Sequence, residues 1–204
     1  CGTWFGGGTP STTNELFWKK GNILWITPKD MKSIMITDTI KKITHEAIKG
    51  SSANLIEKPA VLFVMRSGIL RRILPIAMST QPVTVNQDIK ALVPNDDIIL
   101  KYLCWFCISR ENDIREQCSK SGTTVESINT KSLYSYITKI PSLPEQQEIV
   151  RILDSLFRKE QKAKELCHVI DKIDLMKKAI LARAFRGELG TNDPSEESAV
   201  ELLK

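Results

Sequence analysis

The sequence predicts an α+β protein, in which a globular domain of mixed helices and strands over residues 1–141 is followed by one long coiled-coil helix over residues 142–187. Three observations predict this class. Short β-type runs alternate with turn residues in the first part of the chain. No Pro or Gly occurs between Pro144 and Gly187. The composition, 42% hydrophobic and 26% charged, is typical of a soluble globular chain. Residues 188–204 follow as an acidic tail.

The globular domain is expected to consist of short elements separated by Gly, Pro, Asn and Asp. Residues 6–12 form a Gly-rich loop, which lacks the Gly-Lys-Ser/Thr ending of a phosphate-binding loop. The expected strands cover residues 23–27, 54–56, 60–65, 73–78 and 82–85. The expected helices cover residues 38–49, capped by Asp38 or Thr39, and about 98–117, capped by residues 95–97. A turn at 122–124 returns the chain to the sheet.

The long helix has clear start and stop signals. Ser142 is a good N-cap, Glu145 completes a capping box, and Pro144 lies in the first turn, where its missing N–H costs nothing. Gly187 ends the helix directly after basic residues. At roughly 1.5 Å per residue the helix would be about 60 Å long, more than a domain of this size needs.

Its apolar residues recur at the a and d positions of a heptad repeat, with mostly charged neighbours. Lys159 and Lys177 interrupt this seam. The pattern predicts a helix that pairs with a second helix, although a helix lying on its own globular domain is the alternative. The expected pairing residues are Ile149, Ile152, Leu156, Ala163, Leu166, Ile170, Ile173 and Ile180.

The cysteines indicate a reducing compartment, which we expect to be the cytoplasm. Their number, five, is odd, and no signal peptide or apolar run of membrane-spanning length is visible. Cys104 and Cys107 form a Cys-X-X-Cys pair, but it lies in an apolar run and no second pair completes a zinc site. We therefore expect small core thiols, no bound metal and no contact with a membrane.

The basic charge lies in the globular domain. Residues 1–140 contain 18 basic and 12 acidic residues, a net charge of +6, whereas residues 191–204 carry −3. Such a distribution favours a polyanionic partner modestly, since surface lysines alone often give a similar total.

The candidate DNA-contacting residues lie in turns after expected strands. Arginine suits bidentate contact to guanine or phosphate, and Asn and Gln can pair with adenine edges. A solvated hairpin end is the alternative for the arginine-rich loop, and ordinary turn chemistry explains Asn86 equally well. The candidates are Lys29, Arg66, Ser67, Arg71, Arg72, Asn86 and Gln87.

No catalytic constellation is recognisable in the sequence. It contains no Asn-Pro-Pro-Tyr methyltransferase motif, no Gly-rich nucleotide loop, and two histidines without a nucleophile in a known motif. We expect a non-catalytic chain.

Five motifs occur in one order along the chain. They are Gly8-Thr9-Pro10-Ser11-Thr12, Trp25-Ile26-Thr27-Pro28-Lys29-Asp30, Asn86-Gln87-Asp88, Gly122-Thr123 and Ile140-Pro141-Ser142-Leu143-Pro144-Glu145-Gln146-Gln147. The last motif runs into the seamed helix, which ends in Ala184-Phe185-Arg186-Gly187-Glu188-Leu189. In this order, over nearly the whole chain, they resemble one half of the specificity (S) subunit of a type I restriction–modification system.

The resemblance implies a division of labour. In that family each target-recognition domain reads one half of a split site in double-stranded DNA, and long helices space the two domains and hold methyltransferase (M) subunits. Catalysis with S-adenosylmethionine belongs to those partners, and restriction (R) subunits join the same complex. This chain would thus hold no cofactor of its own.

The chain departs from the family pattern because it has one recognition domain and one spacer helix instead of two of each. It is expected to pair through the long helix with a second copy of itself or with a second half, to which residues 188–204 would be the linker. Two other functions stay open: a stand-alone dimeric DNA-binding regulator, and a coiled-coil adaptor that binds only proteins.

Overall fold

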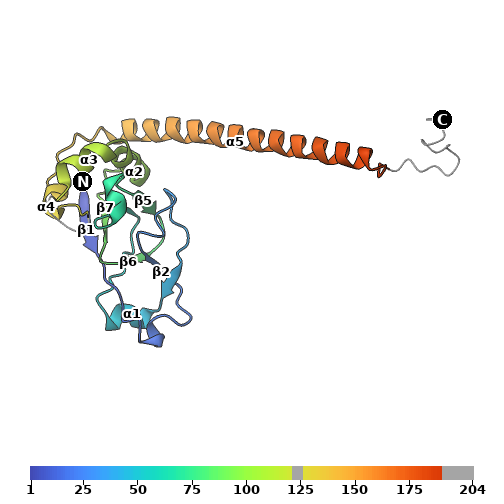
Figure 1. Cartoon of the computed structure of the whole chain (residues 1–204). Helices are drawn as coiled ribbons and strands as arrows, with labels where there is room; N and C mark the ends of the chain where they lie inside the picture. Colours follow the sequence, from blue (N-terminus) through green and yellow to red (C-terminus); the bar gives the residue numbers. More distant parts are fainter. Residues whose placement is uncertain (121–125, 190–204) are drawn as a thin grey trace, which may run out of the picture. The chain divides into compact units, whose positions relative to one another are not determined.

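The computed structural model describes residues 1–120 and 126–189 (Figure 1). Contacts between residues divide the chain into two units, of which the first spans Cys1–Arg151 and the second begins at Ile152. Both sheets and all the short helices belong to the first unit. The turn expected at 122–124 and residues 190–204 of the expected acidic tail lie outside the described residues.

The main sheet is antiparallel and has four strands in the order β1-β7-β4-β5. These strands are β1 (Gly2–Gly6), β4 (Ala60–Val64), β5 (Ile76–Ser79) and β7 (Ile89–Pro94). In the centre, Leu62 of β4 is paired with Ala91 of β7 on one side and Ala77 of β5 on the other. Every residue of β4 is buried, which explains why its sequence is a continuous apolar run and does not alternate.

The second sheet has three strands in the order β3-β2-β6, with β2 antiparallel to β3 and parallel to β6. Its strands are β2 (Ile23–Ile26), β3 (Lys41–Ile43) and β6 (Val83–Val85). Ile23, Trp25 and Ile43 form a separate small core with Ala47 and Ala53. Residues 86–88 join β6 to β7, so the chain passes here from the second sheet directly into the main sheet.

Short helices complete the first unit. Helix α2 (Leu100–Ser109) packs on β4 and β5, and its Leu103, Cys104 and Cys107 belong to the core of the main sheet (Figure 1). The others are α1 (His45–Gly50), α3 (Glu111–Cys118), α4 (Thr130–Tyr134) and the 3-10 helices η1 (Glu15–Phe17) and η2 (Gly68–Arg71).

Several expected elements are wrong in type or extent. The helix expected over 38–49 is strand β3 followed by α1, because Lys41–Ile43 pair with β2 and Thr44, whose hydroxyl accepts from the N–H of Ala47, caps the helix. Of the strand expected over 54–56, only Ile56 pairs, through reciprocal bonds with Val83.

The helix expected over 98–117 is interrupted at Arg110 and forms α2 and α3. The expected cap at residues 95–97 does not form, since α2 has Ile99 as its N-cap without a side-chain bond from its own flank. Strand β7 and helix α4 were not expected. Strand β7 is short, and its pairing with β1 and β4 contributes more to its formation than its local sequence preference does.

The long helix is confirmed. Helix α5 runs without interruption over Leu143–Phe185, 43 residues, and Figure 1 shows it as a single continuous helix. At its start the N–H and the hydroxyl of Ser142 donate to the Glu145 carboxylate at 2.8 and 2.6 Å. These two bonds hold the pKa of Glu145 below its usual value. The α+β class, with a long C-terminal helix, agrees with the sequence prediction.

Candidate nucleic-acid interface

The ends of strands β2, β4 and β6 meet at one place in the first unit. The backbone N–H of Asn86, which follows β6, donates to the carbonyl of Ile26 in β2 at 2.9 Å. The N–H of Met65, which follows β4, donates to the carbonyl of Asp88 at 2.7 Å. The loops that leave these strands surround a hollow of about 500 Å³, which we call the interface hollow.

Asp30 organises the loop that follows β2. One of its carboxylate oxygens accepts from the N–H and the hydroxyl of Thr27, at 2.9 and 2.7 Å. The other accepts from the N–H of Ile40 at 2.8 Å. All these donors belong to the chain itself, so the Asp30 carboxylate holds the loop in place, and the neighbouring Lys29 is exposed on the wall of the hollow.

The side chain of Asn86 likewise holds its own loop, the turn between β6 and β7, through hydrogen bonds within the chain. It is 6% exposed; its side-chain oxygen accepts from the N–H of Asp88 at 3.1 Å, and its side-chain nitrogen donates to the Asp88 carboxylate at 3.2 Å. This is the Asx-turn chemistry that the sequence left open as an alternative. Asn86 lines the hollow, but a base contact would have to replace bonds that the turn already uses.

Hydrogen bonds join the loop at residues 8–12 to this region. The hydroxyl of Thr9 donates to the side-chain oxygen of Gln87 at 2.6 Å, and the indole N–H of Trp25 donates to the carbonyl of Gly8 at 3.0 Å. A Cβ at Gly7 would lie 1.8 Å from the carbonyl oxygen of Val85, so this close approach requires glycine. Three of the ordered sequence motifs therefore come together in space.

Arg66 and Ser67 enter the hollow from the end of β4. Arg66 forms an isolated β-bridge with Ser127, which fixes its backbone, while its side chain is exposed and makes no ion pair within residues 1–120 and 126–189. The Ser67 hydroxyl accepts from the N–H of Ile69 at 3.4 Å and so caps η2. The backbone of Arg66 is therefore fixed, while its exposed guanidinium can bind a partner.

The other two predicted arginines lie in and after η2 and do not line this hollow. The Nε of Arg71 is paired with Glu126 at 3.2 Å, an exposed pair that contributes little to stability. Arg72 is exposed. The structure thus brings Lys29, Arg66, Ser67 and Asn86 together, with Gln87 in the adjoining turn, and leaves Arg71 and Arg72 apart from them.

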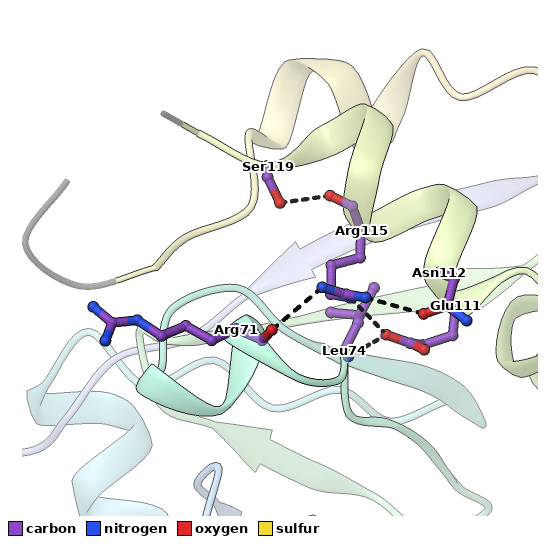
Figure 2. Close-up of polar contacts among 6 residues, drawn as sticks. All are labelled: Arg71, Leu74, Glu111, Asn112, Arg115 and Ser119. Atoms are coloured by element: carbon purple, nitrogen blue, oxygen red, sulfur yellow. Dashed lines mark hydrogen bonds and ion pairs between the residues drawn. The ribbon is translucent and has the colours of Figure 1, made fainter. Parts of the chain in front are cut away.

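Figure 2 shows what holds the segment that carries η2. The Glu111 carboxylate accepts from the N–H of Leu74 at 2.5 Å and from the Nε of Arg115 at 3.2 Å. Arg115 also donates to the Asn112 side chain at 3.0 Å and to the carbonyl of Arg71 at 3.5 Å. The side chain of Arg71 points away from this cluster (Figure 2). The cluster fastens α3 to the connection between η2 and β5.

Sequence reasoning missed Ile40 and Lys41, which also line the hollow. The sequence feature that could have pointed to them is the adjacent basic pair Lys41-Lys42, which lies in the helix predicted over residues 38–49. The strand β3 instead brings Lys41 beside β2, where its ammonium lies 5.3 Å from the centre of the Trp18 ring.

The cysteines of α2 lie in the core of the main sheet. Burial raises the pKa of the Cys104 and Cys107 thiols to about 12, so both are protonated in the folded chain at neutral pH. Among residues 1–120 and 126–189, no cluster of three His, Cys, Asp or Glu could hold a metal ion. No helix in these two ranges is both long enough and apolar enough to cross a bilayer.

The chain matches a known protein family. Residues 3–168 match the family described as Type I restriction modification DNA specificity domain. The chain is 43% identical over 153 residues to the Escherichia coli type I restriction enzyme EcoR124I/EcoR124II specificity subunit, an alignment that covers 75% of this chain and 38% of that subunit.

Two solved structures share the fold. The HsdS subunit from Thermoanaerobacter tengcongensis aligns with a TM-score of 0.61 at 18% identity, over 92% of this chain and 43% of that chain. A chain solved in work on complex assembly and conformational transition of the type I R-M system aligns with a TM-score of 0.65 at 20% identity, over 91% and 44%. The chain therefore spans less than half the length of these relatives. Residues 3–168 are most of the chain, and the chain therefore belongs to the type I restriction–modification DNA specificity domain family.

Proposed function

We propose that this chain is the DNA-reading half of a type I specificity subunit and recognises one half of a bipartite site in double-stranded DNA. The observation that carries the proposal is the interface hollow, in which Lys29 and Arg66 lie exposed beside Ser67 and Asn86. Family membership supports the same function.

The charges around the hollow suit a polyanion. Three cations, Lys29, Lys41 and Arg66, line the hollow with two carboxylates, Asp30 and Asp88, a net charge of +1, and Lys29 and Arg66 form no ion pair among the described residues. Lysine is a compact charge that suits phosphate, and the arginine fork suits a guanine edge. In this proposal Lys29 positions the DNA backbone and Arg66 contacts a base.

Helix α5 supplies the docking surface for other chains. All eight predicted seam residues are exposed, and the seven that are Ile or Leu range from 38% for Ile149 to 65% for Leu166. Further apolar side chains beside the seam, Val169 and Met176, are 49% and 62% exposed, so the apolar face is wider than a and d positions alone. A face this wide fits more than one neighbouring helix. We propose that it holds methyltransferase subunits and a second copy of this chain or a second half.

The chemistry would then belong to partner subunits. S-adenosylmethionine and the methyl transfer are assigned to the methyltransferase subunits, and DNA cleavage to restriction subunits that join the complex. This chain would hold no cofactor. Since the chain would bind cellular DNA, the cytoplasm is its proposed location.

A binding experiment tests the proposal. The full chain is titrated into labelled duplexes that contain a random central segment, at several salt concentrations, and bound duplexes are sequenced. We expect a short enriched sequence and an affinity that falls steeply with salt. Binding without enrichment would refute sequence reading, and no binding to DNA even in the presence of a methyltransferase subunit would favour the adaptor.

Co-purification separates the proposal from the stand-alone regulator. A methyltransferase subunit should be retained by the tagged chain, and methylome sequencing should find one modified motif that disappears when the gene is removed. A chain that binds DNA as a dimer but retains no methyltransferase would be the regulator.

A further inference from the structure

A second hollow, of about 550 Å³, adjoins the interface hollow, and Ile40 and Lys41 line both. Trp18, Lys19 and Lys42 are among the other residues that line the second hollow. Ile40 and Lys41 therefore form a ridge between two concave surfaces, and we call this pair the ridge.

Ile40 is 70% exposed on this ridge. Single exposed apolar residues are common and by themselves mean little. What distinguishes Ile40 is its charged surroundings. Lys29 and Arg66 line the hollow on one side, Lys19 lines the hollow on the other, and Lys41 follows it in the chain. Glu15 also lines the second hollow, and Asp38 is paired with Lys42 at 2.9 Å.

The backbone holds Ile40 in this exposed position. Its N–H donates to Asp30 at 2.8 Å, and the hydroxyl of Thr39 donates to the carbonyl of Lys41 at 2.7 Å. The side chain of Lys41 is itself placed by the Trp18 ring. A β-branched side chain on a fixed backbone has few rotamers to lose, so a contact made by Ile40 costs little conformational entropy.

A side chain without hydrogen-bonding groups can still distinguish bases. In the major groove thymine presents a methyl group, whereas cytosine presents an amino donor at the neighbouring position. An isoleucine against the methyl group buries apolar surface on both sides. The same isoleucine against the cytosine amino group would remove water from a donor without replacing its hydrogen bond, which is costly.

We infer, resting on the proposed DNA-reading function, that Ile40 is a specificity-determining residue that contacts the methyl group of one thymine in the half-site. Lys29 on one side of the ridge and Lys19 on the other place it by binding the phosphates that flank this base. Neither sequence pattern nor family membership singles out this residue.

The test compares sequence selection by the full-length wild type, Ile40→Ala and Ile137→Ala. Ile137 is 94% exposed and lines neither hollow, so its variant controls for loss of an exposed isoleucine. The wild type and Ile137→Ala should enrich the same sequence. Ile40→Ala should lose the preference for thymine at one position only, and Ile40→Val should keep part of it.

A second measurement replaces each thymine of the enriched duplex in turn by deoxyuridine, which lacks the methyl group. At one position the wild-type affinity should fall about fourfold, the effect of one buried methyl group. The affinity of Ile40→Ala should not change at that position, because the partner of the methyl group is already gone.

The inference would be overturned, while the proposed function would stand, if Ile40→Ala enriched the same sequence as the wild type. The same holds if the wild type tolerated deoxyuridine at every position. Equal weakening of Ile40→Ala on all duplexes would also overturn it, since that indicates a general contact. A wild type that enriches no sequence would refute the proposed function itself.

Discussion

The side-chain oxygen of Gln146 accepts a hydrogen bond from the backbone N–H of Ile99 at 2.9 Å, which joins the first turn of α5 to the start of α2. The side-chain nitrogen of Gln146 donates to the carbonyls of Asp97 and Pro141, each at 3.0 Å. Gln146 is 1% exposed, and all its polar atoms are satisfied by backbone groups. The glutamine supplies the cap that α2 does not obtain from its own flank.

Replacing Gln146 by leucine should lower the free energy of unfolding by about 2–4 kcal/mol, because it leaves backbone groups of residues 97, 99 and 141 without partners. Denaturant unfolding followed by circular dichroism measures the change. The matched control is Gln147→Leu at the next, exposed position, which should change stability by less than about 0.5 kcal/mol. Equal effects of the two substitutions would show that the buried contacts of Gln146 contribute nothing.

Replacing Arg66 by alanine should cost about 1–3 kcal/mol in binding free energy at one base position and relax the sequence preference there, as expected for a base contact. Lys29→Gln should instead weaken binding to all sequences alike and reduce the slope of log affinity against log salt by about 0.9, as expected for one lost phosphate contact. Titration of both variants against matched and single-mismatch duplexes distinguishes the two roles. Uniform weakening by Arg66→Ala would reassign this arginine to the DNA backbone.

Replacing Leu166 and Ile170 together by lysine should abolish helix pairing without unfolding the first unit, because these seam residues are 65% and 58% exposed. Analytical ultracentrifugation at micromolar concentration measures self-association, and co-purification measures retention of a methyltransferase subunit. Leu175→Lys, at a position 68% exposed but outside the seam, is the control and should keep both. A wild-type chain that sediments as a monomer would exclude self-pairing.

Thiol alkylation of the folded protein at neutral pH should modify Cys1 and Cys167 and spare Cys104, Cys107 and Cys118. The first two are exposed, whereas burial raises the pKa of the other thiols, to about 12 for Cys104 and Cys107. Peptide mass spectrometry after brief iodoacetamide treatment counts the modified sites, and treatment in denaturant should modify all five. Rapid native labelling of Cys104 would contradict the packing of α2 on the main sheet.

Stability should decline at high pH through Tyr136. Burial and then the hydrogen bond that its hydroxyl donates to Asp113 raise the pKa of Tyr136 to about 12. An unfolded tyrosine ionises near pH 10, so the stabilisation is complete below about pH 10 and is lost as the pH rises toward 12. The difference in unfolding free energy between wild type and Tyr136→Phe should therefore be constant up to about pH 10 and shrink above it. A difference that does not depend on pH would show that the hydroxyl is not held in this way.

Local pattern was sufficient where an element is long or continuously apolar. The absence of Pro and Gly after Pro144, with a heptad repeat, identified α5 to within a residue or two at each end, and the apolar run at 60–65 identified β4. Helical periodicity and continuous burial leave repeated marks in a sequence, so no distant contact is needed to recognise them.

Short elements could not be recognised in this way. Residues 41–43 belong to a strand only because β2 lies beside them, and residues 89–94 form the strand between β1 and β4 for the same reason. Pairing partners 16 to 92 positions away contribute more free energy than the weak preferences of a three- to six-residue segment.

Local patterns in the sequence were enough to predict the α+β class, the long helix with its apolar seam and the basic character of residues 1–140. The tertiary structure decided which of the predicted DNA-contacting residues lie together. Lys29, Arg66, Ser67 and Asn86 lie together at one hollow, whereas Arg71 is paired with Glu126 elsewhere. The hollow is also lined by Lys41 of strand β3 and by Ile40, the residue before that strand. The physical reason is that a surface is assembled from the ends of strands whose neighbours are fixed by pairing across the whole chain, and pairing of that kind leaves no mark in any single stretch of sequence.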